Sequence, residues 1–219
     1  MWMIGKRPAV ITATGDGWQV APTQVRFAGG SATVSGVTGR HPQFSADMSA
    51  MPLGVLDIVR PGLELGGVAS GRVAYGWNNG RPNGQMNINV RGLSRAGLVL
   101  SSQPIDVGLA GVLNGSQAGV RAVAVSNGQT IGRGQARFAP LAGGSLVASL
   151  MNAPLFAQLR YAGPADTLWR LSGTELFDLS GPVAIGADVR GSLNDPQIRG
   201  SLRTTRARLG SAVTGTVVT

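Results

Sequence analysis

The feature that most constrains the fold is a two-residue alternation of apolar and polar positions that recurs along most of the chain. In 183–193 every second residue is apolar or glycine, and after a turn at Asn194-Asp195-Pro196 the pattern resumes in 198–202. A period of two places successive side chains on opposite faces of an extended strand. Each stretch therefore predicts a strand with one apolar and one polar face, and the turn between them predicts a bend.

Strands of this kind are predicted over most of the remaining sequence. Short ones are expected in 9–39 and longer ones in 63–150, where Asn78-Asn79-Gly80, Asn114-Gly115 and Asn127-Gly128 are turn signals. The 219 residues include 34 glycines and only 5% are aromatic, which suits many short strands better than a large aromatic core. The sequence predicts an all-β protein with a few short helices, built as an elongated, U-shaped curved sheet with an apolar concave face.

Two segments have helical rather than strand spacing. In 45–59 apolar side chains recur every three or four residues until Pro61-Gly62, and in 152–171 the same spacing begins with Leu155–Leu159. Helices this short are marginal in isolation, so we expect both to lie against the apolar face and to plug or cap it. The side chains predicted to form this helical plug are Met48, Met51, Val55, Val59, Leu168 and Trp169.

The order of these elements occurs twice along the chain. A shift of 114 positions places the first predicted helix over the second and Pro82 over Pro196 (196 − 82 = 114). Repetition of this kind indicates an elongated architecture in which each unit contacts its neighbours. We therefore expect residues 1–219 to form a single elongated segment of a longer protein, with repeat units at roughly 45–95 and 155–210.

The basic charge does not by itself indicate a nucleic-acid partner. The formal net charge is +9, from 19 basic and 10 acidic residues, and Lys6 is the one lysine among the arginines. The arginines are mostly scattered on predicted polar faces without the aromatic stacking surface that single-stranded nucleic acid requires. We expect no nucleic-acid partner, and weak contact with anionic head groups fits the charge better.

The sequence offers no group of residues suited to catalysis or to binding a metal or cofactor. There is one histidine, His41, beside a proline in a predicted loop, and no cysteine. The acidic residues form no close pair on a predicted face, apart from Glu175 and Asp178, which we interpret as a polar connection. We therefore expect neither an enzyme nor a bound cofactor. No run of about 18 apolar residues is present that would predict a membrane-spanning helix.

The glycines on the predicted apolar faces leave space where a core would normally be filled. Ile105, Val107 and Leu109 share a face with Gly111, and Gly200 lies within the apolar run of the last long strand. Glycine permits a sharp bend of the sheet, and small side chains also leave room for an apolar ligand such as an acyl chain. A U-shaped sheet would satisfy both interpretations. The residues predicted to line this groove are Ile105, Val107, Leu109, Leu113, Val183, Ile185, Val189, Leu193, Ile198 and Leu202.

The C-terminal part of the chain resembles a known family. Residues 178–215 are similar to the C-terminal repeat region of the TamB proteins of the AsmA-like family, and 51–77 and 17–36 resemble the same unit upstream. The likeness covers most of the chain. The matching positions are Leu179, Gly181, Val189, Gly191, Leu193, Pro196, Ile198, Gly200, Leu202, Ala207, Leu209 and Gly215.

This resemblance implies a hydrophobic β-groove, known as a β-taco, in a protein that crosses the periplasm from an inner-membrane anchor absent from this chain. It implies phospholipid acyl chains as cargo and, through the full-length protein, an outer-membrane barrel protein of the TamA type as partner. Phospholipid movement and support of outer-membrane protein assembly and secretion are the functions it suggests. The alternative is a structural β-solenoid with a dry core, such as a surface adhesin stem.

Overall fold

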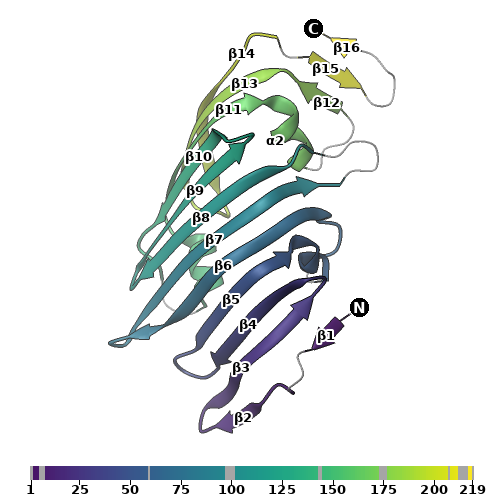
Figure 1. Cartoon of the computed structure of the whole chain (residues 1–219). Helices are drawn as coiled ribbons and strands as arrows, with labels where there is room; N and C mark the ends of the chain where they lie inside the picture. Colours follow the sequence, from purple (N-terminus) through teal and green to yellow (C-terminus); the bar gives the residue numbers. More distant parts are fainter. Residues whose placement is uncertain are drawn as a thin grey trace.

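The protein is built around one open antiparallel sheet whose strands follow one another along the chain (Figure 1). The computed structural model describes residues 2–4, 8–58, 60–96, 102–142, 145–172, 177–206, 208–211 and 217–218. Figure 1 shows a long, curved sheet with the two termini at its opposite ends. The prediction of an all-β protein with a few short helices is thereby confirmed.

The large sheet contains 13 strands in the order β1-β3-β4-β5-β6-β7-β8-β9-β10-β11-β13-β14, with β2 paired to β3 outside this path. A second sheet has the order β12-β15-β16. The strands are β1 (Trp2–Ile4), β2 (Ile11–Thr14), β3 (Gly17–Phe27), β4 (Gly30–Val37), β5 (Gln43–Pro52), β6 (Leu65–Asn78), β7 (Arg81–Arg95), β8 (Ile105–Asn114), β9 (Gln117–Ser126), β10 (Gln129–Phe138), β11 (Leu155–Pro164), β12 (Phe177–Ser180), β13 (Pro182–Gly191), β14 (Pro196–Thr204), β15 (Arg208–Ser211) and β16 (Val217–Val218). The helices are the 3₁₀ helix η1 (Leu53–Ile58) and the α-helices α1 (Leu146–Asn152) and α2 (Ala165–Leu171).

Tight Asn-Gly turns join two pairs of the long strands, as predicted, whereas Asn114 of the third predicted turn is the last residue of β8. Asn79-Gly80 connects β6 to β7 and Asn127-Gly128 connects β9 to β10, and both residues of each turn have a positive φ. Two positive φ values in succession define the turn whose twist matches that of antiparallel strands, and Asn followed by Gly adopts it most readily. These turns are why sequence neighbours become sheet neighbours.

The strand register separates the side chains into two continuous faces. We call one the apolar face; a row of cross-strand neighbours from β7 to β14 on it is Ile88, Leu109, Ala122, Gly134, Leu159, Ala187 and Gly200. We call the other the polar face; the adjacent row on it is Asn87, Ala110, Arg121, Gln135, Gln158, Asp188 and Arg199. Because the register is kept through all these strands, the alternation seen within each strand extends over the sheet.

The two α-helices lie on the apolar face at opposite ends of the strands. Ala165 and Leu168 of α2 pack in a cluster with buried side chains of the sheet, namely Ile105, Ile131, Tyr161 and Val183. Leu150 of α1 packs in a second cluster, around Phe138, Ala153 and Leu155. Between the two clusters the apolar face is less covered, and Leu159 there is 43% exposed. The two packed clusters therefore lie at opposite ends of the strands, and further buried side chains, such as Met51 and Val90, lie in the earlier strands.

The predicted helix over 45–59 is wrong for its first half. Met48 and Met51 lie in β5, and Val55 lies in the 3₁₀ helix that follows. The ladder between β5 and β6 shifts register between Met48 and Met51, where Ala50 has a positive φ. This irregularity inserts an extra residue, so two methionines three residues apart face the same side and imitate helical spacing. Val59 lies outside the described residues.

The predicted helix over 152–171 is correct only at its end. Leu155–Leu159 belong to β11, and the helix that contains Leu168 and Trp169 begins at Ala165. Leu155 and Leu159 are on the apolar face and Phe156 is on the polar face, as their partners in β13 show. Spacings of one and four residues occur in strands and helices alike, so this short run could not distinguish them.

Candidate functional site

Nine of the ten residues predicted to line a groove lie on strands, and all nine project from the apolar face. Ile105, Val107, Leu109 and Leu113 are on β8, and Val183, Ile185 and Val189 are on β13. Ile198 and Leu202 of β14 pair directly with residues of β13, Ile198 with Val189 and Leu202 with Ile185. The structure thus brings these side chains onto one surface, although β8 and β13 are separated by three intervening strands.

Of these nine side chains, those on β8 and β13 are buried or half-buried, whereas those on β14 are exposed. Those near the strand ends, Ile105, Leu113 and Val183, are buried. Those at the C-terminal edge of the sheet, Ile198 and Leu202, are 66% and 64% exposed. The apolar face is therefore closed at the ends of its strands and open along the β14 edge.

Leu193 does not join this surface. The strand β13 ends at Gly191, and Leu193 lies in the connection to β14, where it is exposed. Gly191 has a positive φ, and Asp195 donates its backbone N–H to Ser192 Oγ, so the chain turns before the alternation reaches Leu193. Two further positions of the family pattern, Ala207 and Gly215, lie outside the described residues.

The predicted plug residues have different surroundings. Leu168 packs against the cluster formed with Ile105 and Tyr161, and Trp169 lies beside it on α2. Met51 is buried in β5, at the other end of the sheet, while Val55 is only half-buried. The residues predicted to form a plug thus lie in separate places, Leu168 and Trp169 on a helix over the C-terminal strands and Met51 buried near the N-terminal ones.

Glycine occupies positions on the apolar face for two different structural reasons. A Cβ added at Gly200 would lie 2.5 Å from the carbonyl oxygen of Gly186 and 3.2 Å from Cα of Ala187, so the neighbouring backbone occupies that space. A Cβ added at Gly134 would have no atom nearer than 3.8 Å. Gly200 therefore permits close strand approach, whereas Gly134 leaves room beside Leu159 on the partly open middle of the face.

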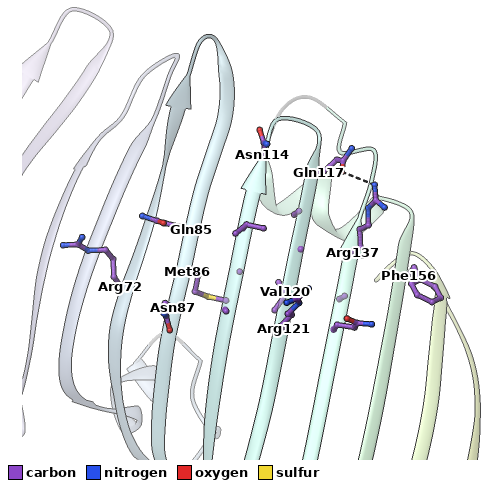
Figure 2. A pocket seen from close by; sticks show the side chains of 17 residues that line it. Arg72, Gln85, Met86, Asn87, Asn114, Gln117, Val120, Arg121, Arg137 and Phe156 are labelled. Atoms are coloured by element: carbon purple, nitrogen blue, oxygen red, sulfur yellow. Dashed lines mark hydrogen bonds between the residues drawn. The ribbon is translucent and has the colours of Figure 1, made fainter.

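The polar face carries the larger hollow, which sequence reasoning did not identify. It has a volume of about 950 Å³, and Figure 2 shows side chains from β6 to β11 around it. Most of the lining side chains are polar-face residues, such as Arg72, Gln85 and Arg121, and Arg137 donates a hydrogen bond to Gln117 at 3.0 Å. None of the predicted groove residues lines it. This hollow depends on which residues lie opposite one another across the strands, such as Gly119 and Arg137. Periodicity within one strand does not predict those cross-strand partners.

A smaller hollow of about 460 Å³ lies over β10, β11, β13 and β14 and is lined by three arginines, Arg133, Arg160 and Arg203. Arg133 and Arg160 are direct cross-strand neighbours, and Gly186 lies opposite Arg160 on the next strand. Ile185 is the one predicted groove residue in its lining.

Two ion pairs occur on the polar face among the described residues. Arg72 donates to Asp47, with Nε 2.6 Å from Oδ1, and Arg160 Nη1 lies 3.1 Å from Asp188 Oδ1. The hydrogen bonds between Arg72 and Asp47 favour the charged form of both side chains. They therefore lower the pKa of Asp47 and raise the pKa of Arg72. Both pairs are solvent-exposed, so they contribute little to stability.

Tyr161 is a buried polar side chain that the sequence patterns did not single out. Its hydroxyl donates to the carbonyl oxygen of Pro164 at 2.7 Å, and Thr167 of α2 is buried beside it. Burial raises the pKa of Tyr161, the hydrogen bond with Thr167 opposes this, and Asp166 adds to the rise. These contacts hold α2 against β11.

The one histidine contacts an aromatic ring of the neighbouring strand β6. The rings of His41 and Trp77 meet edge to face, with their centroids 4.9 Å apart. Within the described part of the chain, no three His, Asp or Glu side chains gather as a metal site would need. No helix in that part has the length and hydropathy to cross a bilayer.

Comparisons with known proteins give no match: no protein-family model, no curated protein and no solved structure is similar to this chain.

Proposed function

We propose that this chain is a segment of a cell-envelope bridge of the TamB type, in which phospholipid acyl chains move along the apolar face. In this proposal the curved sheet forms the wall of a U-shaped groove, and α2 caps one side of it. The observation that carries the proposal is the continuity of the apolar face through successive strands, together with its partial exposure between the helix-covered clusters.

The dimensions of the sheet suit movement by steps along this face. Twelve strands lie in the sheet order, which at about 4.8 Å per strand gives a path of about 50 Å. One acyl chain is about 15 Å long, half of the roughly 30 Å hydrocarbon core of a bilayer. Each exposed CH₂ costs about 0.8 kcal/mol in water, so contact with the apolar face would hold an acyl chain at any position along it. Because neighbouring positions are similar, the acyl chain could slide from one to the next.

The small side chains support a moving ligand over a fixed one. Ala122 and Gly134 are direct cross-strand neighbours, Ala187 lies in the same row beyond Leu159, and these three positions offer apolar surface without a polar side chain. A strong polar contact would stop transport at one position. The absence of a fixed binding pattern on this face is therefore compatible with conduction of many acyl chains.

The cellular setting belongs to the same proposal. The bridge would lie in the periplasm and be anchored to the inner membrane. It would support outer-membrane protein assembly and secretion through a barrel partner of the TamA type. A structural stem is the competing function, which the two buried clusters favour because they stabilise the sheet without any ligand.

The experiment uses two substitutions that place the same charge on opposite faces of one strand. Leu109→Glu puts a carboxylate on the apolar face, and Ala110→Glu puts it on the exposed polar face, next to Arg121. Glutamate is preferred to arginine because a long arginine side chain can keep its stem on apolar surface while its head reaches water. Each protein is mixed with phosphatidylcholine that carries a photoreactive group in its acyl chain, and crosslinked peptides are identified by mass spectrometry.

We expect crosslinks to peptides of the apolar face in the wild type and in Ala110→Glu, and a severalfold loss in Leu109→Glu. Circular dichroism establishes that both variants keep the sheet. Equal crosslinking in the three proteins, or crosslinks confined to polar-face side chains, would leave a structural stem as the better explanation.

A further inference from the structure

The polar face is strongly basic over the C-terminal half of the sheet. All arginines of β9, β10, β11, β13 and β14 project from this face, and these strands contain one acidic residue, Asp188. The earlier strands differ, because there Asp47 pairs with Arg72 and Asp106 lies on β8. We call this basic area the arginine face; its arginines are Arg121, Arg133, Arg137, Arg160, Arg190, Arg199 and Arg203.

Most of this charge is not used within the protein. All seven side chains are exposed. Arg160 pairs with Asp188, Arg137 donates to Gln117, and Arg190 lies over the Phe156 ring at 5.8 Å. The other four have no hydrogen-bond or ion-pair partner among the described residues; they are Arg121, Arg133, Arg199 and Arg203.

The arrangement opposes the stability of the isolated chain. Arg133 and Arg160 face each other directly across β10 and β11, and like charges in that position repel. The single carboxylate nearby, that of Asp188, is taken by Arg160. An external anion bound between these arginines would reduce their repulsion and stabilise the protein. The charge distribution therefore favours an anionic partner.

We infer that the arginine face docks onto the surface of an anionic phospholipid bilayer. The arginines are spread over five neighbouring strands, about 20 Å of sheet, which suits an extended layer of phosphate groups better than one small ligand. The hollow lined by Arg133, Arg160 and Arg203 lies within this area, with Ser201 beside it, and offers space for one head group.

Apolar side chains between the arginines also favour a membrane over a nucleic acid. Val123 and Phe156 project from the same face, and Val112 on the neighbouring β8 is 65% exposed. Such side chains can enter the boundary between head groups and acyl chains, where a combination of basic and apolar residues binds best. On the arginine face, Phe156 is the only aromatic ring in the described strands, and Arg190 covers it. A stacking platform for bases is therefore lacking.

This inference goes beyond the proposed function and does not depend on it, because it concerns the opposite face of the sheet. The test compares two triple variants that remove equal charge. The first is Arg133→Gln, Arg199→Gln and Arg203→Gln, chosen because these side chains have no internal partner among the described residues. The second, the control, is Arg26→Gln, Arg81→Gln and Arg91→Gln on β3 and β7.

Binding is measured by co-sedimentation of the full chain with vesicles of phosphatidylcholine alone and of phosphatidylcholine mixed with phosphatidylglycerol. We expect the wild type to bind the anionic vesicles more tightly than the neutral ones, and this difference to shrink as salt is raised. Each arginine close to an anionic surface contributes about fivefold in affinity, so the first triple variant should bind roughly a hundredfold more weakly. The control variant should lose tenfold or less.

Three results would overturn the inference. They are equal binding to neutral and anionic vesicles, equal losses in the two triple variants, and tighter binding of a DNA duplex than of anionic vesicles at the same salt concentration. Leu109→Glu separates the two proposals, because it should reduce acyl crosslinking while leaving co-sedimentation with anionic vesicles unchanged.

Discussion

Adding one methyl group at two glycines of the apolar face should have opposite effects on stability. Gly134 and Gly200 lie in the same cross-strand row and neither has a positive φ. At Gly134 a new Cβ would meet the carbonyl oxygen of Gln158 and Cδ1 of Leu159 at 3.8 Å, which is ordinary contact. At Gly200 it would lie 2.5 Å from the Gly186 oxygen, so backbone would have to move.

The magnitudes follow from these distances. Replacing glycine by alanine in a compatible conformation stabilises a protein by about 0.4–1 kcal/mol, because the unfolded chain loses freedom. Gly134→Ala should therefore raise the free energy of unfolding by about 1 kcal/mol. Forcing a group into filled space costs about 1–3 kcal/mol. Gly200→Ala should then lower the free energy of unfolding by about 1 kcal/mol after the same entropic gain is subtracted.

The assay is urea denaturation of the wild type and both variants, followed by circular dichroism and tryptophan fluorescence. The midpoints should fall in the order Gly134→Ala, wild type, Gly200→Ala, with a common dependence on urea concentration. If both alanines stabilise equally, Gly200 is not required for close strand approach. If Gly134→Ala is the more damaging, the space beside Leu159 is not free, and the case for an incompletely filled apolar face is lost.

Three further changes test other parts of the structure. Leu168→Ala should lower the free energy of unfolding by about 2 kcal/mol, because it removes a half-buried contact of α2 with the Ile105 cluster, as urea titration would measure. Burial raises the pKa of Tyr161, so its hydroxyl stays protonated to higher pH in the folded state than in the unfolded state. The free energy of unfolding should therefore be unaffected by this group below about pH 10 and should decline as the pH rises above that value. Tyr161→Phe should remove that decline and cost about 1 kcal/mol at neutral pH by leaving the Pro164 carbonyl without its donor, and an unchanged alkaline decline in this variant would assign it to another group. Asp47→Asn should barely shift the urea midpoint at pH 7, since its bond to Arg72 is exposed, whereas a large shift would contradict the view that this pair is weak.

Much of the sheet could be predicted because its local signals agree with its topology. The Asn-Gly turns at 79–80 and 127–128 specify hairpins, and hairpins make consecutive strands neighbours. With that topology, alternation within β8 and β13 was enough to assign Ile105 and Val189 to the same face. Tertiary structure did not have to override local preference in these strands.

The error over 45–59 arose because one inserted residue changed the spacing of the apolar side chains. The extra residue at Ala50 turned the spacing of two methionines from two into three, and the sequence gives no sign of that irregularity. The hollows of the polar face were missed for a different reason. They depend on which residues lie opposite one another, such as Arg133 and Arg160, and cross-strand register is not visible from periodicity within a single strand.

The meander topology has a consequence for how such a molecule can change in size. Each central strand of the large sheet is bonded only to the strands before and after it in the sheet order. Removing or duplicating one complete hairpin preserves both strand direction and the side of the sheet on which each residue falls, whereas removing a single strand reverses the direction of everything that follows. Related molecules could therefore differ in length by whole hairpins, each adding or subtracting about 10 Å, without redesign of the remaining surfaces.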